Sequence, residues 1–142
     1  MGSFSLEALL RAPVQLHGIR LGQPVDALVD TEARRALGFV VLCGDELLRF
    51  LPFAAAQPGT DEIAIGSALM LLEDVGFYSA RSASLRELRG RPVHRNGRPA
   101  GDLVDLCVAR DGAVTQALVQ RDGKEQLLSA EGLSLNSSRA AA

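Results

Sequence analysis

The sequence predicts a mostly β protein made of two tandem small antiparallel β-barrels with short helical turns, in a pseudo-two-fold arrangement. Two observations predict this class. Residues 84–108 repeat residues 5–29 at a constant offset of 79, with ten identities in 25 positions and no gap. Each copy also contains five or six short apolar runs separated by tight turns, and a small sheet of such strands hides its edges by closing into a barrel. The identical pairs are Ser5/Ser84, Leu6/Leu85, Leu9/Leu88, Pro13/Pro92, Val14/Val93, Gly18/Gly97, Gly22/Gly101, Val25/Val104, Asp26/Asp105 and Val29/Val108.

The first copy, residues 1–78, is expected to begin with a helical turn that Ser5 caps and Pro13 ends. Pro52 falls late in an apolar run, so we place it at a sheet edge or a bend. Residues 67–78, the connector to the second copy, fit a strand or one buried helical turn equally well. Strands are expected at residues 14–16, 25–30, 37–43, 46–53 and 61–65.

The second copy, residues 79–136, opens with Ser84 and Glu87 at capping-box spacing, and Gly90 is a natural helix stop. Residues 132–135 stand where the first copy has residues 61–65, and residues 137–142 are expected to form a flexible tail. Because this copy is the shorter one, we expect part of residues 67–78 to pack on its barrel or to add a strand to it. Its strands are expected from residue 92 and at residues 103–109, 114–120 and 126–128, with turns at residues 96–97, 111–112 and 122–123.

The composition is that of an ordinary soluble domain, with 47% apolar and 23% charged residues in a chain of 142. Each copy therefore has about 65–75 residues, close to the lower limit for an independent hydrophobic core. We expect the copies to pack on each other or on a partner chain. The chain has no Trp and one Tyr, so it lacks the aromatic platform on which single-stranded nucleic acid usually stacks.

The net charge of −2 gives no general attraction to nucleic acid or to membranes. The two cysteines have no metal-site spacing, which is typical of reduced thiols in the cytosol. No signal peptide is expected, and the longest apolar run, residues 68–72, is too short to cross a bilayer. We therefore expect a cytoplasmic protein without a membrane-spanning segment.

The repeated skeleton resembles a known family. Its elements are Ser-Leu-x-x-Leu, x-Pro-Val, a glycine, Val-Asp, and two hairpin strands that end in Phe-Leu-Pro-Phe at residues 50–53. This pattern resembles the PRC-barrel, the fold of the cytoplasmic part of the photosynthetic reaction centre H subunit and of the C-terminal domain of the ribosome maturation factor RimM. The resemblance covers nearly the whole chain twice, although the second copy has Leu-Ser-Ala at residues 128–130. It implies an adaptor or docking module that works through its surfaces and has no catalytic residues to transfer.

Asp26 and Asp105 are the equivalent carboxylates of the two copies. A pseudo-two-fold axis could bring them together as an acid–base pair that shares a proton. The alternative is that each accepts backbone hydrogen bonds, or faces solvent beside its strand. We favour the alternative, because no other catalytic constellation accompanies the pair.

The remaining reactive side chains predict neither a metal site nor a cofactor site. His17 and His94 are not equivalent in the repeat, and no cluster of further ligands accompanies them, so we expect turn or surface histidines. Cys43 and Cys107 lie in runs of Val and Leu, where a cysteine acts as a small buried apolar residue. The chain is therefore not expected to be an enzyme.

The charge is concentrated in one segment. Residues 79–98 carry six arginines against Glu87 alone, a charge of +5, which leaves −7 for the rest of the chain. Arginine suits phosphate and carboxylate partners, so the segment could bind RNA, an acidic protein or anionic lipid headgroups. The alternative is a solvated connector that pairs with acidic residues of the first copy. The six are Arg81, Arg86, Arg89, Arg91, Arg95 and Arg98.

Residues 68–72, together with Phe77 and Tyr78, form an apolar excess that we expect at the interface between the copies or in a homodimer interface. The leading hypothesis is a non-catalytic protein-interaction or assembly module whose partner is a protein. The alternative is an RNA- or ribosome-associated binding protein that uses residues 81–98. A third hypothesis, an enzyme, would need a deep cleft between the barrels with perturbed carboxylates.

Overall fold

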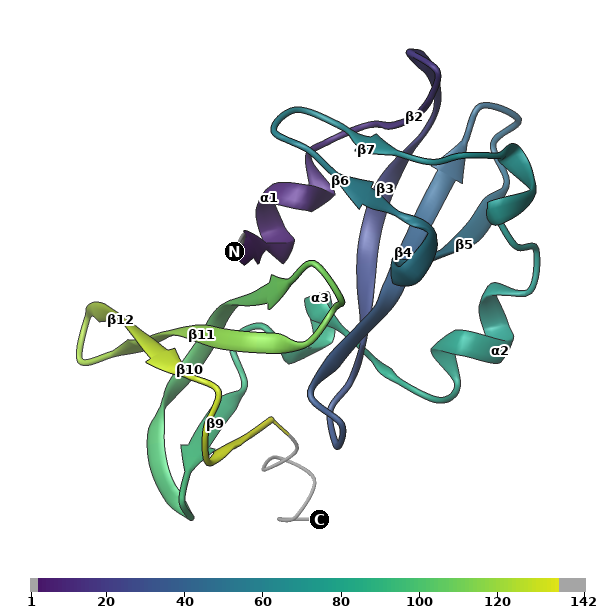
Figure 1. Cartoon of the computed structure of the whole chain (residues 1–142). Helices are drawn as coiled ribbons and strands as arrows, with labels where there is room; N and C mark the ends of the chain where they lie inside the picture. Colours follow the sequence, from purple (N-terminus) through teal and green to yellow (C-terminus); the bar gives the residue numbers. More distant parts are fainter. Residues whose placement is uncertain (1–2, 136–142) are drawn as a thin grey trace.

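The computed structural model describes residues 3–135, and Figure 1 shows a mostly β molecule with two sheets and a few short helices. The predicted mostly β class is confirmed. The first sheet has seven strands and is built chiefly from the first copy, and the second sheet has six strands and is built chiefly from the second copy. The predicted tail at residues 137–142 and the predicted domain end at residue 136 lie outside the described residues.

The first sheet has the strand order β5-β4-β3-β2-β7-β6. Its neighbours are antiparallel except for β2 and β7, which pair in parallel. Pro52 ends β5 at one edge of this order, as predicted. The strands are β2 Val14–Leu16, β3 Ile19–Asp30, β4 Arg35–Cys43, β5 Leu48–Pro52, β6 Gln57–Pro58 and β7 Ile63–Ala64.

The second sheet has the order β12-β11-β10-β9-β13. Residues 132–135 take the place predicted for them, because β13 lies beside β9 as β7 lies beside β2. The direction differs, since β13 and β9 are antiparallel. The strands are β9 Pro92–Arg95, β10 Arg98–Ala109, β11 Val114–Arg121, β12 Lys124–Ser129 and β13 Leu133–Ser134.

The two longest strands, β3 and β10, begin six and five residues earlier than the apolar runs predict, at residues 19 and 98. A repeated glycine permits the extension. A Cβ atom at Gly22 would lie 2.7 Å from the carbonyl oxygen of Leu42, and one at Gly101 would lie 2.9 Å from that of Gln120. Neighbouring strands thus approach too closely there for any side chain, which gives a structural reason for this repeated pair.

Both predicted helix starts are confirmed. The N-cap Ser5 accepts a hydrogen bond from the backbone N–H of Ala8 at 3.1 Å, which begins α1, Leu6–Leu10. Ser84 and Glu87 form the capping box of α3, Leu85–Leu88, with bonds of 3.1 and 3.3 Å. The remaining helical elements are η1 Phe53–Ala55, η2 Ala68–Met70 and α2 Val75–Ser79.

Residues 67–78 pack on the first sheet, so the expectation that part of them extends the second copy is wrong. Leu72 forms an antiparallel bridge with Phe50 on the outer edge of β5, with two backbone hydrogen bonds of 2.8 Å. Six residues later, Tyr78 in α2 stacks on the Phe50 ring, with centroids 4.1 Å apart and 11° between the planes. The segment is neither a regular strand nor one helix, because η2, a single bridge and α2 follow in turn.

The copies exchange their first strands. β1, Ser3–Ser5, pairs with β10 in the second sheet, and β8, Ala83–Ser84, pairs with β3 in the first. The registers of the two pairings correspond. Ser5 lies opposite Cys107, and Ser84 lies opposite Leu28. Ser84 is the equivalent of Ser5 and Cys107 that of Leu28, both at the offset of 79. Each sheet is therefore completed by a strand from the other copy.

A third contact lies between the copies, where Arg35 and Ala113 form an antiparallel bridge. The flanking backbone bonds are 2.7 and 2.9 Å long. One cluster of buried side chains runs through both sheets and includes Leu6, Phe39 and Leu106, each 0% exposed. The copies thus pack on each other as predicted. Within residues 3–135, neither sheet closes on itself through strand pairing, and closure into barrels remains a prediction.

Candidate functional site

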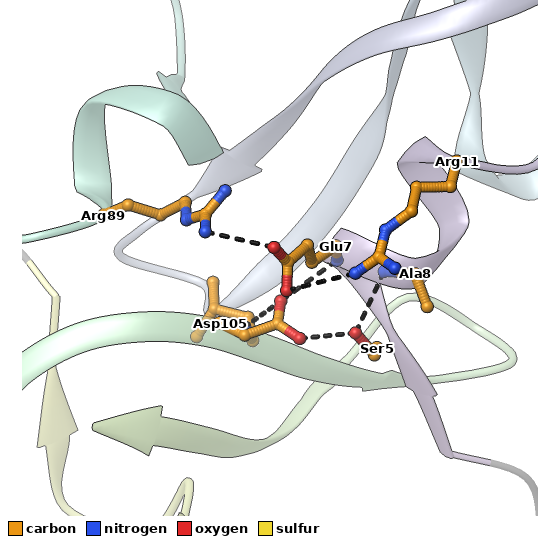
Figure 2. Close-up of polar contacts among 7 residues, drawn as sticks. Ser5, Glu7, Ala8, Arg11, Arg89 and Asp105 are labelled. Carbon is orange, nitrogen blue, oxygen red and sulfur yellow. Dashed lines mark hydrogen bonds and ion pairs between the residues drawn. The ribbon is translucent and has the colours of Figure 1, made fainter. Parts of the chain in front are cut away.

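The seam between the copies holds a polar network around Asp105, which is only 5% exposed (Figure 2). Its carboxylate accepts hydrogen bonds from the Ser5 hydroxyl and from the backbone N–H of Glu7 at 3.1 Å. It also accepts the N–H of Leu106 at 2.8 Å. An aspartate of the second copy thus binds the free N–H groups at the start of α1, where a carboxylate is stabilising.

Asp26 of the first copy likewise binds a backbone N–H group at the start of α3 in the second copy. Its Oδ1 atom accepts the backbone N–H of Arg86, in the first turn of α3, at 3.2 Å, and that of Ala27 at 2.8 Å. The interpretation that these aspartates accept backbone hydrogen bonds is confirmed for both. Among the described residues, no hydrogen bond joins Asp26 to Asp105. The two aspartates are equivalent in the repeat because each one caps the first helix of the other copy.

Glu7 lies between two arginines in Figure 2. Its carboxylate oxygens lie 3.1 Å from the Arg89 guanidinium and 3.7 Å from that of Arg11. Arg89 directly follows α3 of the second copy and Glu7 lies in α1 of the first, so this ion pair crosses the seam. The pair is partly exposed, and its contribution to stability is therefore small.

Two other arginines of the segment line one cavity of ≈ 440 Å³, beside the turn between β3 and β4. Arg81 and Arg91 share its wall with the carboxylates of Asp30, Glu32 and Glu87. The Arg81 guanidinium also donates to a backbone carbonyl at 2.8 Å. The wall thus has mixed charge, which disfavours a strongly anionic ligand.

The last three arginines lie apart from this cavity. The Nε–H of Arg86 donates to the carbonyl of Val25 at 2.8 Å, which adds another contact across the seam. Arg95 donates to the Ser129 hydroxyl at 3.0 Å and lies opposite Arg98 in the hairpin of β9 and β10. Figure 1 places α2, α3 and β9 in different parts of the molecule. Of the six arginines, only Arg91 and Arg98 have a guanidinium group without a hydrogen-bonding or ionic partner in the described structure.

The histidines and cysteines form no metal site in the described residues. His17 occupies an exposed turn with a φ of 50°, as predicted, whereas His94 is half-buried in β9 with its Nδ1 atom buried and unbonded. No group of three His, Cys, Asp or Glu side chains suited to a metal ion occurs within residues 3–135. Cys43 is buried and Cys107 is half-buried, where burial and, secondarily, the Asp105 charge raise the pKa of its thiol.

The apolar excess of the connector lies largely on the surface. Leu69 is 85% exposed and Phe77 is 46% exposed, so the expectation that these side chains lie between the copies is wrong. The reason is the docking of the connector: Leu72 and Tyr78 face β5, which turns Leu69 and Phe77 outward.

A second exposed apolar group lies on the hairpin of β4 and β5. Leu42 lies opposite Leu48, and Leu47 precedes Leu48 in the turn. These leucines are 42%, 49% and 57% exposed. Sequence reasoning missed them because the apolar runs at residues 37–43 and 46–53 predict strands but do not show which of their residues face solvent. The turn at Gly44 signals that both strands end in a projecting tip, which leaves their last residues exposed.

No protein-family model matches the chain, and no curated protein matches it. In the described part of the chain, no helix combines the length and apolar character needed to cross a membrane. Function must therefore be inferred from the surfaces described above.

Proposed function

We propose that the chain is a non-catalytic protein-interaction or assembly module of the PRC-barrel type, built from two tandem barrel-like copies. The reciprocal exchange of β1 and β8 supports the tandem arrangement, because both pairings follow the offset of the sequence repeat. The use of Asp26 and Asp105 as helix caps supports a non-catalytic role, because backbone N–H groups occupy the Oδ1 atom of each carboxylate.

One observation carries the interaction function: large apolar side chains remain exposed on the hairpin of β4 and β5 and on the connector. Leu69 at 85% exposure and Leu47 at 57% exposure are the extreme cases. Contiguous exposed apolar groups are typical of surfaces that bind other proteins, and Leu42, Leu47 and Leu48 lie together at the end of one hairpin. We infer that a protein partner covers some of these side chains.

RNA binding through residues 81–98 is the second candidate. Arg91 and Arg98 favour it, since they have free guanidinium groups in the described structure. The other four arginines bond within the chain through their side chains. These bonds hold the four guanidinium groups against four different partners, which disfavours one continuous phosphate-binding surface, so the protein-binding proposal is preferred.

The test is capture of partners by the tagged full-length protein from cells that express it naturally, at low and high salt. The doubly substituted L47Q/L69Q protein should lose a protein partner that the wild type keeps at high salt. The matched R91Q/R98Q protein should keep it. If R91Q/R98Q instead loses captured RNA, and that capture falls steeply with salt, the RNA-binding candidate is supported.

A further inference from the structure

In the first copy, the outer edge of β5 is covered by the connector. Phe50 exchanges both backbone hydrogen bonds with Leu72, and its ring stacks on Tyr78. Beneath this cover, Leu28, Val40 and Phe50 are 2%, 8% and 1% exposed. The outer face of the first sheet thus has its own small apolar core, which the connector completes.

The second copy has the same face without the cover. The equivalents of Leu28 and Phe50 are Cys107 and Leu127, at offsets of 79 and 77, and Leu118 replaces Val40 at an offset of 78. Cys107 and Leu118 are half-buried, while Leu127 is 51% exposed.

The edge of β12 is open in the same register. Phe50 lies opposite Val40 in β4 and directs its N–H and C=O outward to Leu72. Leu127 lies opposite Leu118 in β11, at the equivalent position, so its N–H and C=O also point away from the sheet. Within residues 3–135, β12 pairs with β11 and with no other strand.

We propose that the β12 edge, with Leu118 and Leu127, is a docking site for an apolar segment of a partner protein. The segment adds an antiparallel strand by hydrogen-bonding to Leu127, and an aromatic side chain about six residues later covers the leucines. This is recognition by strand addition, in which backbone bonds give affinity and side-chain contacts give specificity. The chemistry of the occupant is taken from Leu72 and Tyr78, which perform this task on the equivalent edge.

Two other occupants fit less well. Residues 136–142 of the chain itself contain Asn, Ser, Arg and Ala, with no branched aliphatic or aromatic residue. A second copy of β12 could pair edge to edge, but its sequence, Lys-Glu-Gln-Leu-Leu-Ser, brings no aromatic ring. It would leave the apolar face uncovered. The inference rests on the proposed interaction function and names the partner's chemistry at one site.

The probe for this site is a synthetic peptide with the sequence of residues 67–79, added to the isotope-labelled full-length protein and followed by NMR. We expect saturable shifts of the Leu127 amide and of its neighbours in β12 and β11. The L127D protein should bind the peptide at least about tenfold more weakly. Its matched control, I19D, changes an apolar residue that is 66% exposed and lies on β3, outside the site, and should bind as the wild type does.

Changes in the peptide provide a test that cannot be confused with misfolding of the protein. A Leu72→Pro peptide lacks the N–H that pairs with the strand, and a Tyr78→Ser peptide lacks the ring, so both should bind weakly. Absence of shifts in β12 overturns the inference, and so does binding confined to β5. Concentration-dependent shifts of β12 without peptide also overturn it, since they identify a second copy as the occupant. The capture experiment above changes Leu47 and Leu69, so it can succeed although this site fails.

Discussion

Asp105 accepts the backbone N–H of Glu7 at 3.1 Å although 98 positions of the chain separate them. The same carboxylate takes the Ser5 hydroxyl, and Ser5 is itself the N-cap of α1. The start of the first helix is therefore held by the second copy. Asp26 holds the start of α3 in return, through the N–H of Arg86.

Replacing Asp105 by alanine should lower the free energy of unfolding by about 3 kcal/mol, because backbone donors lose their acceptor in a buried place. Asp102→Ala is the matched control, since Asp102 is exposed and lies three residues away on the same strand. Urea denaturation followed by circular dichroism measures both. Equal losses in the two proteins would contradict the capping role of Asp105.

Gly22→Ala should destabilise the protein by about 2–3 kcal/mol, as overpacking does when the neighbour is rigid. The added Cβ would lie 2.7 Å from the Leu42 carbonyl oxygen, which cannot move without disturbing β4. Gly44→Ala is the control, because no atom lies within 4 Å of a Cβ at that position. Thermal unfolding of the two proteins compares them, and a harmless Gly22→Ala would refute the close approach of β3 and β4.

The ion pair of Asp45 and Arg49 predicts a pH dependence. Two hydrogen bonds of 2.9 and 2.8 Å from Arg49, aided by the N–H of Leu47, lower the pKa of Asp45 from 3.8 to about 2. Since the folded pKa is below the unfolded value, this pair stabilises the fold above about pH 4. Its contribution is lost as the pH falls toward 2. Carboxyl carbon NMR titration should give the low pKa, and Arg49→Gln should return it toward 3.8; no change would contradict the pairing.

The Cys107 thiol should react slowly in the folded protein. Its pKa is raised, first by burial and second by the charge of Asp105, so little thiolate is present at pH 8. We expect alkylation by iodoacetamide to be at least about tenfold slower in the folded protein than in urea. Mass spectrometry of peptides gives the rate at Cys107 alone. Similar rates in both conditions would show that the thiol is not shielded.

Local signals in the sequence predicted local structure well. Ser84 and Glu87 form the expected capping box because both partners lie within one helical turn. The turn at His17 follows from its neighbouring glycine in the same way. The repeat also identified Asp26 and Asp105 as equivalent. It could not identify their partners, because these depend on the exchange of strands between copies.

Nonlocal pairing limited the rest of the prediction. Leu72 could pair with any exposed strand edge, and hydrophobic periodicity contains no information about which edge is open. The lengths of the two copies therefore favour packing of part of the connector on the shorter copy, whereas the connector covers Phe50 of the first. Likewise, the six arginines are close in sequence, but of them only Arg81 and Arg91 line the cavity beside the turn between β3 and β4, and the other four lie elsewhere.

The exchange of β1 has a consequence for synthesis of the chain. Its residues Ser3–Ser5 are translated long before their partners, Cys107, Val108 and Ala109. At a translation rate of about 5–20 residues per second, roughly 5–20 s pass between synthesis of β1 and synthesis of its partner β10. The nascent first copy can form β2 to β5 during this time, but α1 stays without its Asp105 cap. Completion of the first copy thus depends on the ribosome finishing most of the second.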